Sequence, residues 1–246
     1  MREIMIGLLS MIFYNINAQS FMPKWISYPE VDSTSQIWFR QTYITDLRPT
    51  LADINITTTG QIELYVNGYN VSTDTRLPYR EYNDRDKPIC ISFNVTRFLR
   101  NDSNTIAVWY SPSYPHIDSR QISLNYSGTM PDGENFSYNA NDEWICRKAN
   151  ISLTTDGEEE FTSPSNDAVW NSPEYEPACW IRARQQNNEA TTSILDYASF
   201  YKSRRITRII HPKYHRISQD SIQYKFGSAF QGYVRITLRG AKKAEK

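Results

Sequence analysis

Carboxylate and imidazole side chains that could act in catalysis occur in three short segments of the sequence. They are the consecutive Glu158, Glu159 and Glu160, the spaced pair Asp84 and Asp86, and the pair His211 and His215. Inverting glycoside hydrolysis needs two carboxyl groups about 6.5–9.5 Å apart around a sugar-sized cleft. Consecutive residues of a strand point to opposite faces, so the glutamate run is typical of a solvated loop and predicts no catalytic pair.

The other two segments are equally consistent with ordinary surface loops. Asp84 and Asp86 lie in the charged stretch 80–87, where a calcium or sugar contact and an exposed turn both remain open. Two histidines fall short of the three protein ligands of a catalytic zinc, and Pro212 disfavours a helix that would align them. No nucleophile elbow or phosphate-binding loop is present. We predict no catalytic residue, no metal site and no cofactor.

Aromatic side chains provide the remaining route to ligand binding, because a pyranose offers an apolar C–H face to a ring. Tyr110, Tyr114 and His116 lie close together, with Pro112 and Pro115 between them. Prolines restrict a loop and lower the entropy lost on binding. We predict that these three side chains bind carbohydrate; packing of the rings into the core or within the loop is the alternative.

Period-2 alternation dominates the elements that must position these residues. Residues 62–66 alternate and lead into Asn67-Gly68, the strongest short-range signal of a hairpin. Residues 94–100 then predict a strand end and one turn of helix, and residues 105–109 another strand. Further strands are predicted at residues 37–44, 52–56, 89–95 and 122–126. Besides residues 95–100, only residues 192–201 suggest a short helix.

Together these signals predict an all-β chain whose main part is an antiparallel β-sandwich, or jelly roll. It resembles the galactose-binding-like sandwich, which points to carbohydrate. Residues 205–210, 221–226 and 233–238 predict a further set of strands, the last two joined through Gly227 and Gly232. Three strands cannot bury both of their faces. We therefore expect this block to dock onto the first sandwich or to drive self-association, with its basic residues limiting aggregation.

Charge and hydropathy limit the possible cellular locations of the protein and its possible partners. The 27 basic and 27 acidic residues cancel, so no global field favours nucleic acid or a membrane surface. Arg2, the apolar run 4–13 and the small residue Ala18 resemble a secretory signal. That run is too short to span a membrane. We expect a periplasmic or secreted protein with a signal peptide at residues 1–19, a sandwich at 20–190 and the start of a second sandwich at 191–246.

The three cysteines leave the redox state open. The number of cysteines is odd, and their positions, Cys90, Cys146 and Cys179, lack the spacing of zinc ligands. Three separate thiols and one disulfide with one remaining thiol are both compatible with the sequence.

Among the tryptophans, Trp38, Trp109, Trp144 and Trp180 are assigned to the core or to a seam between domains.

Read in order, the segments resemble the non-catalytic amino-terminal region of bacterial α-L-rhamnosidases. The matching segments are Trp25-Ile26, Trp38-Phe39-Arg40, residues 64–68, Asn94-Val95-Thr96, residues 104–109, residues 141–144, Trp170-Asn171, residues 178–180, and residues 224–227 with 230–235. The resemblance implies a galactose-binding-like sandwich followed by a partial second one. Its catalytic (α/α)₆ barrel would follow Lys246.

Two departures from the family pattern bear on function. Residues 157–160 run into residues 161–163 without the family's Asp and Arg, and Lys225 replaces an aspartate. The resemblance therefore implies an exported accessory module that binds carbohydrate, such as a rhamnose-containing glycan, and gives no rhamnosidase turnover by itself. A catalytic partner, a homo-oligomer, a fragment of an active α-L-rhamnosidase, and an adhesion sandwich without sugar specificity remain alternatives.

Overall fold

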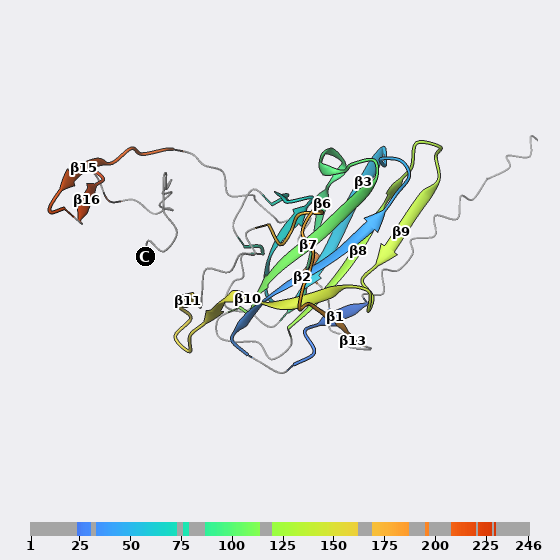
Figure 1. The fold of residues 1–246 in the computed structure, drawn as a ribbon, viewed down its shortest axis with the longest axis horizontal. Coiled ribbons are helices and arrows are strands. Elements are labelled where there is room, and N and C mark those ends of the chain that lie inside the picture. The colour runs from blue at the N-terminus through green and yellow to red at the C-terminus, as the bar shows by residue number, and fades with distance from the viewer. Residues whose placement is uncertain are drawn as a thin grey trace, which may run out of the picture. The chain divides into compact units, whose positions relative to one another are not determined.

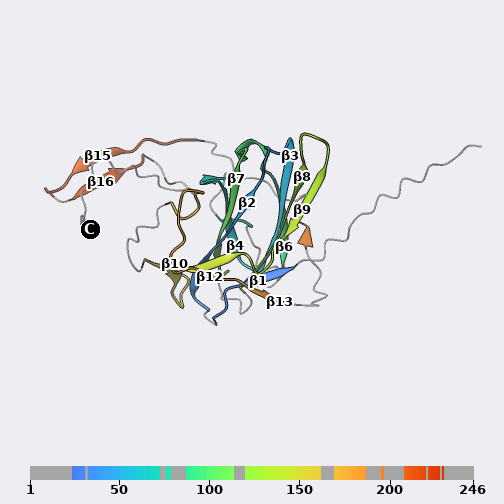
Figure 2. The same cartoon turned by 45° about the vertical axis from the view of Figure 1, so that its right-hand side comes forward.

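The computed structural model describes residues 24–30, 33–72, 76–78, 87–113, 120–161, 169–186, 195–196, 208–219, 221–227 and 229. The chain divides into two compact units, Met1–Ser203 and Arg204–Lys246. The first unit is a sandwich of two β-sheets, seen as two layers in Figure 2, and the elements are labelled in Figure 1. Within the described residues, no helix is long and apolar enough to cross a membrane. The predicted signal peptide, residues 1–19, lies outside the described residues.

Sheet A forms one layer and contains seven strands. In order across the sheet they are β13 (Arg184–Gln186), β1 (Trp25–Ser27), β8 (Gln121–Thr129), β3 (Leu51–Thr58), β6 (Ile89–Asn94) and β14 (Leu195–Asp196), with β9 (Asn135–Asn139) also pairing with β8. All pairs are antiparallel except that between β14 and β6.

Sheet B forms the other layer, and its strands are all antiparallel. Their order is β11 (Glu159–Phe161), β10 (Ile145–Leu153), β2 (Ser35–Ile44), β7 (Ser103–Ser111), β4 (Gln61–Val66) and β5 (Tyr69–Asn70), with β12 (Ile181–Arg182) also pairing with β10. The predicted all-β sandwich is confirmed.

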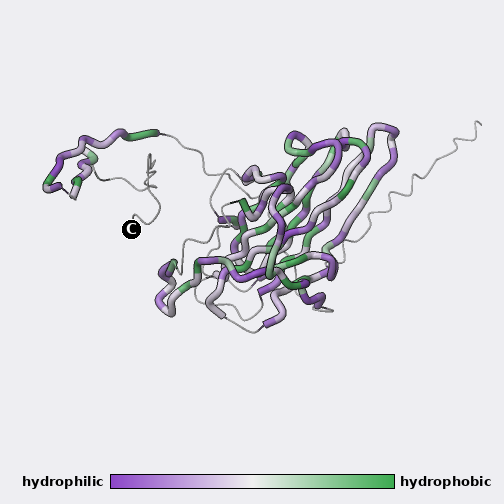
Figure 3. Tube along the Cα trace, in the orientation of Figure 1, coloured by the Kyte–Doolittle hydropathy of each residue, from purple (hydrophilic) through white to green (hydrophobic). Residues whose placement is uncertain are grey.

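Alternating apolar residues of both sheets form the core between the layers. Apolar residues at alternate positions of the central strands are fully buried, among them Ile54 and Ile56 of β3, Leu64 of β4 and Val108 of β7. The tube coloured by hydropathy shows apolar segments interleaved with polar ones along these strands (Figure 3). Trp144 has no exposed surface and belongs to this core, as predicted.

The outer face of sheet A carries rows of small polar side chains. Strand pairing aligns Asn139, Asn125, Asn55 and Ser92 in one row, and Ser137, Ser127, Asp53 and Asn94 in the next. Hydrogen bonds join neighbours within and between the rows, such as Asn125 Nδ2 to Asn139 Oδ1 at 3.0 Å and Asn94 Nδ2 to Asp53 Oδ1 at 2.9 Å. This face is therefore polar but almost free of charge.

The predicted Asn67-Gly68 turn is present and joins β4 to β5. Both residues have positive φ, 51° and 82°, as a type I′ turn requires. The Asn67 side chain also donates to Asn104 Oδ1 and accepts from the Thr105 amide, each at 2.9 Å. The turn is thereby fixed to β7, its neighbour in the sheet.

The helical prediction for residues 95–100 is confirmed as one short 3₁₀ turn, η2 (Thr96–Phe98). Thr96 Oγ1 accepts a hydrogen bond from the Ala52 amide at 2.9 Å, which attaches this turn to β3. The second suggested helix, residues 192–201, is wrong where it is described, because Leu195 and Asp196 form β14. Its other residues lie outside the described part.

The second unit contains a two-stranded hairpin of β15 (Lys213–Arg216) and β16 (Ile222–Lys225). A strand at residues 221–226 was predicted and is confirmed. Its partner is β15, which was not predicted, and residues 208–210 are not in a strand. Residues 205–207 and 233–238 lie outside the described part.

Candidate functional site

A groove lies between β2 of sheet B and β9 of sheet A. Residues 41–44 of β2 form one wall and residues 137–139 of β9 the other, with Lys24, Asn141 and Glu143 completing the lining. The cavity volume is about 570 Å³, within the usual range for small-molecule sites. We call it the β2–β9 groove.

The groove forms because β10 stops short of the end of β2. The pairing of β10 with β2 ends at Ile145 and Arg40, so residues 41–44 of β2 have no partner strand on that side among the described residues. On the other wall, β9 pairs with β8 through a tight turn in which Gly133 has φ 89° and Asp132 Oδ1 accepts from the Glu134 amide at 3.0 Å. Two strand edges are left facing open space.

Four aromatic rings form the apolar part of the site. Tyr43 lies 5.1 Å from Tyr138 and 5.3 Å from Tyr126, and Tyr126 lies 4.9 Å from Phe136, between ring centroids. Tyr126 is fully buried, whereas Tyr138 is 44% exposed. Burial raises the pKa of both Tyr43 and Tyr126, so these hydroxyls stay protonated. The site therefore presents Tyr138 as an accessible ring held by packed neighbours.

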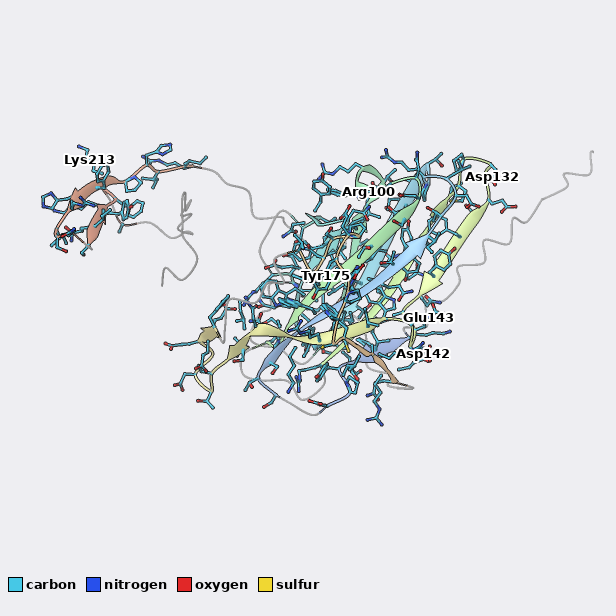
Figure 4. All side chains as sticks on the ribbon, in the orientation of Figure 1. Arg100, Asp132, Asp142, Glu143, Tyr175 and Lys213 are labelled. Atoms are coloured by element: carbon cyan, nitrogen blue, oxygen red, sulfur yellow. The ribbon has the colours of Figure 1, made fainter. Side chains whose placement is uncertain are left out.

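Amide and charged side chains surround this ring. Asn139 Oδ1 accepts a hydrogen bond from Asn125 Nδ2 at 3.0 Å, so the Asn139 NH₂ group points away from Asn125. Asn141 Oδ1 accepts from the Glu143 amide at 3.2 Å, and its Nδ2 donates to Glu143 Oε2 at 3.3 Å. Lys24 adds an ammonium group to the lining. Figure 4 labels Glu143, which lies with Asp142 near one end of β9.

A buried polar atom lies among the four rings. The Tyr126 hydroxyl has no hydrogen-bond partner among the described residues, although buried polar groups are almost always paired. Stacking on Tyr138 with hydrogen bonds to the surrounding amides suits a small polyhydroxylated molecule.

Of the three predicted sugar-binding residues, Tyr110 is described, and it does not line this groove. Tyr110 is fully buried in the main core, and its hydroxyl lies 3.3 Å from Thr59 Oγ1. Tyr114 and His116 lie outside the described residues, so carbohydrate binding by the three stays a prediction. Tyr138, the accessible ring, was not singled out from the sequence. The Asp132-Gly133 turn was the signal that could have revealed its strand.

A second aromatic cluster, the outer Trp cluster, covers the outer face of sheet B. It consists of Trp38, Trp109, Trp170, Trp180, Tyr65 and Tyr175 with Ala107 and Ala149. Trp38 stacks on Trp170 with ring centroids 4.8 Å apart, and Trp109 meets Trp38 edge-on at 5.8 Å. The assignment of Trp38, Trp109 and Trp180 to packed positions is thus confirmed, in a cluster separate from the main core.

Arg40 holds the covering loop, residues 169–180, onto this cluster. Its guanidinium donates to the carbonyl oxygens of Trp170 and Ser172 at 3.2 Å and of Tyr175 at 3.1 Å. The guanidinium carbon also lies 5.5 Å from the centre of the Tyr175 ring. Burial lowers the pKa of Arg40, and the three carbonyl groups offset the cost of burying its charge.

The remaining candidates form no site in the described part of the chain. No three His, Cys, Asp or Glu side chains there lie close enough together to hold a metal ion. His211 and His215 are described and exposed, whereas Asp84 and Asp86 lie outside the described residues. Cys90, Cys146 and Cys179 form no disulfide among the described residues, and burial raises the pKa of Cys146 to about 12.

Solved structures with the same fold are α-L-rhamnosidases. The enzyme from Dictyoglumus thermophilum matches with a TM-score of 0.68 at 19% identity, over 86% of this chain and 26% of that chain. The enzyme from Aspergillus terreus matches at 0.58 and 19%, over 68% and 21%. A family GH78 rhamnosidase from Bacillus sp. GL1 matches at 0.55 and 18%, over 72% and 20%. No family model and no curated protein matches the sequence.

These matches define the chain as a β-sandwich that resembles part of the α-L-rhamnosidases, and the predicted resemblance is confirmed at the level of the fold. The chain spans only 26% or less of the length of each of these three enzymes.

Proposed function

We propose that this chain is an exported, non-catalytic module that binds carbohydrate in the β2–β9 groove. The observation that carries the proposal is the accessible Tyr138 ring, bordered by the amides of Gln41, Asn139 and Asn141 in a cavity of about 570 Å³. Sugars are bound in this way, with a ring under the apolar face and amide groups on the hydroxyls.

Two further points support the proposal. The solved structures that share the fold are enzymes named for a rhamnoside, which makes L-rhamnose and rhamnose-containing oligosaccharides the first ligands to test. Glu143 is the carboxylate in the described groove lining, and inverting hydrolysis needs two. Export rests on Arg2, the apolar run 4–13 and Ala18 of the sequence.

The test is binding of the full chain to a glycan array, followed by calorimetric titration of the best ligand into two variants. Tyr138→Ala removes the platform, and we expect about a tenfold or larger loss of affinity because a stacked ring contributes on the order of 1 kcal/mol beyond its buried area. Tyr69→Ala is the matched control, since Tyr69 is 60% exposed on β5 in the other sheet.

Two outcomes would contradict the proposal. Absence of binding to any glycan on the array would favour an interaction module without sugar specificity. Equal affinity of the Tyr138→Ala and Tyr69→Ala variants for the sugar would show that the sugar does not bind in the groove. In that case Tyr114 and His116, whose role the sequence suggests, become the next residues to change.

A further inference from the structure

The outer edge of β9 presents unpaired backbone groups. The hydrogen bonds from Met130 N to Glu134 O at 2.8 Å and from Ala140 N to Leu124 O at 2.7 Å set the alternation of the β8–β9 ladder. In an antiparallel ladder, bonded and non-bonded pairs alternate. Phe136 and Tyr138 therefore bond to β8, and Asn135, Ser137 and Asn139 direct their N–H and C=O groups outward.

No strand among the described residues pairs with this outer edge. The strand contains no charged residue and no proline, and its residues are exposed apart from the half-buried Phe136. Natural edge strands are normally protected by charge, proline or a covering segment, because an open edge is a template for another strand. The cavity of about 570 Å³ beside β9 leaves room for one.

The sequence of β9 is symmetrical about Ser137. It reads Asn135, Phe136, Ser137, Tyr138, Asn139, so an asparagine and an aromatic residue stand on each side of the central serine. If two copies pair antiparallel about a two-fold axis at Ser137, each asparagine faces an asparagine, each aromatic ring faces an aromatic ring, and Ser137 faces itself. An interface between identical subunits about a two-fold axis requires such self-complementarity.

We propose that two copies of this chain associate through β9, joining their A sheets into one continuous sheet. The outward N–H and C=O groups of Asn135, Ser137 and Asn139 would then exchange hydrogen bonds with those of the second copy. Aromatic pairs in facing positions of neighbouring strands stabilise a sheet further. The inference rests on the backbone of β9 and does not require sugar binding, but a second copy would occupy the groove in which we propose that sugar binds.

Carboxylates at both ends of the strand set the conditions for this association. Asp132 lies at the tip of the β8–β9 hairpin, and Asp142 and Glu143 lie near the other end of β9 (Figure 4). The same two-fold pairing brings the end of β9 that is near Asp132 in one copy towards the end that is near Asp142 in the other. Salt screens repulsion between exposed charges, so the dimer should tighten as ionic strength rises.

The edge can be tested with a proline at Ser137, together with an alanine control that loses the same hydrogen bond from Asn125 Nδ2 to Ser137 Oγ. Ser137→Pro removes an N–H that β8 does not use, and prolines are tolerated at such edge positions. It deletes two intermolecular hydrogen bonds per dimer, so we expect the dimer dissociation constant, measured by sedimentation, to rise at least tenfold. Ser137→Ala keeps the N–H and should leave the constant within about twofold.

A second measurement covers the case in which Ser137→Pro fails to fold. Amide hydrogen exchange of the unmodified chain should slow at Ser137 and Asn139 as protein concentration rises, and it should stay constant at the β16 amides. A chain that sediments as a monomer at every concentration and salt level overturns the proposal. So does a dimer that Ser137→Pro leaves unchanged, or one that forms without slower exchange at these amides.

Discussion

Arg40 is a buried charged residue that packs beside the outer Trp cluster. It is 3% exposed and satisfies three carbonyl groups of the loop 169–180. Backbone carbonyls left unpaired in a buried place are costly. One side chain therefore determines whether this loop stays on the sheet and keeps Trp38 and Trp170 buried.

Replacing Arg40 by methionine should detach this loop. We expect a loss of about 2–4 kcal/mol in the free energy of unfolding, because three carbonyls lose a charged donor. The tryptophan emission should also shift to longer wavelength as the indoles meet water. Urea unfolding and fluorescence spectra measure the two effects.

Arg100→Met is the matched control, because Arg100 binds Glu174 of the same loop at 2.8 Å but both side chains are exposed. Exposed ion pairs contribute about 0–1 kcal/mol. Equal effects of the two substitutions would show that the loop is not held mainly by Arg40.

Gly128, near the end of β8, shows how an element depends on the absence of a side chain. A methyl group there would meet the Leu51 carbonyl oxygen and would lie 2.9 Å from both the Ala52 Cα and the Phe136 ring. These atoms belong to β3 and β9, the strands on either side of β8. The close approach of three strands at this point therefore requires glycine.

Gly128→Ala should accordingly destabilise the first unit by about 1–3 kcal/mol, the usual cost of inserting atoms into a packed region. Chemical denaturation followed by far-ultraviolet circular dichroism measures the change. Gly227→Ala serves as the control, because nothing lies within 4 Å of the added methyl group. A negligible effect of Gly128→Ala would mean that β3 and β9 can move apart freely at this position.

Most strands of the sandwich could be predicted because alternation reports burial directly. The same rule explains the position of Tyr110, which shares a strand face with the buried Ile106 and Val108. Pairing partners could not be predicted. β1 and β13 meet through Trp25 and Gln186, and local alternation carries no information about which distant strand lies alongside.

The groove escaped prediction for the same reason. It exists because β10 stops pairing with β2 at Arg40 and because β9 is the partner of β8. Both facts are matters of register between strands. A register depends on contacts across the sheet, which a single sequence does not display.

At the scale of the whole molecule, the main core belongs entirely to the first unit. Every residue of that core lies between Ile26 and Ala183, whereas the described hairpin of the second unit exposes Tyr214, Ile222 and Tyr224. A two-stranded hairpin is marginally stable by itself. The described residues thus place the packed apolar side chains of the sandwich in the first unit.

Deletion of residues 204–246 should leave the unfolding free energy of the sandwich within about 0.5 kcal/mol of that of the full chain, because none of the described core residues is removed. Thermal and urea unfolding test this expectation. Association through β9 should persist in the shortened chain. Loss of the dimer would favour the other route considered from the sequence, self-association through the carboxy-terminal strands. If the deletion instead unfolds the whole shortened chain, the second unit belongs to the core.

The polar rows on sheet A have a consequence for how the protein is produced. Residues two apart in a strand share a face. Asn55, Asn125 and Asn135 are each followed, two residues later, by a residue with a hydroxyl group. This spacing is also the acceptor motif for N-linked glycosylation. In a eukaryotic secretory host, Asn135 is the exposed acceptor for N-linked glycosylation, whereas Asn125 is only 8% exposed. A glycan added at Asn135 would mask the β9 edge, whereas material from a host without this modification would leave it bare.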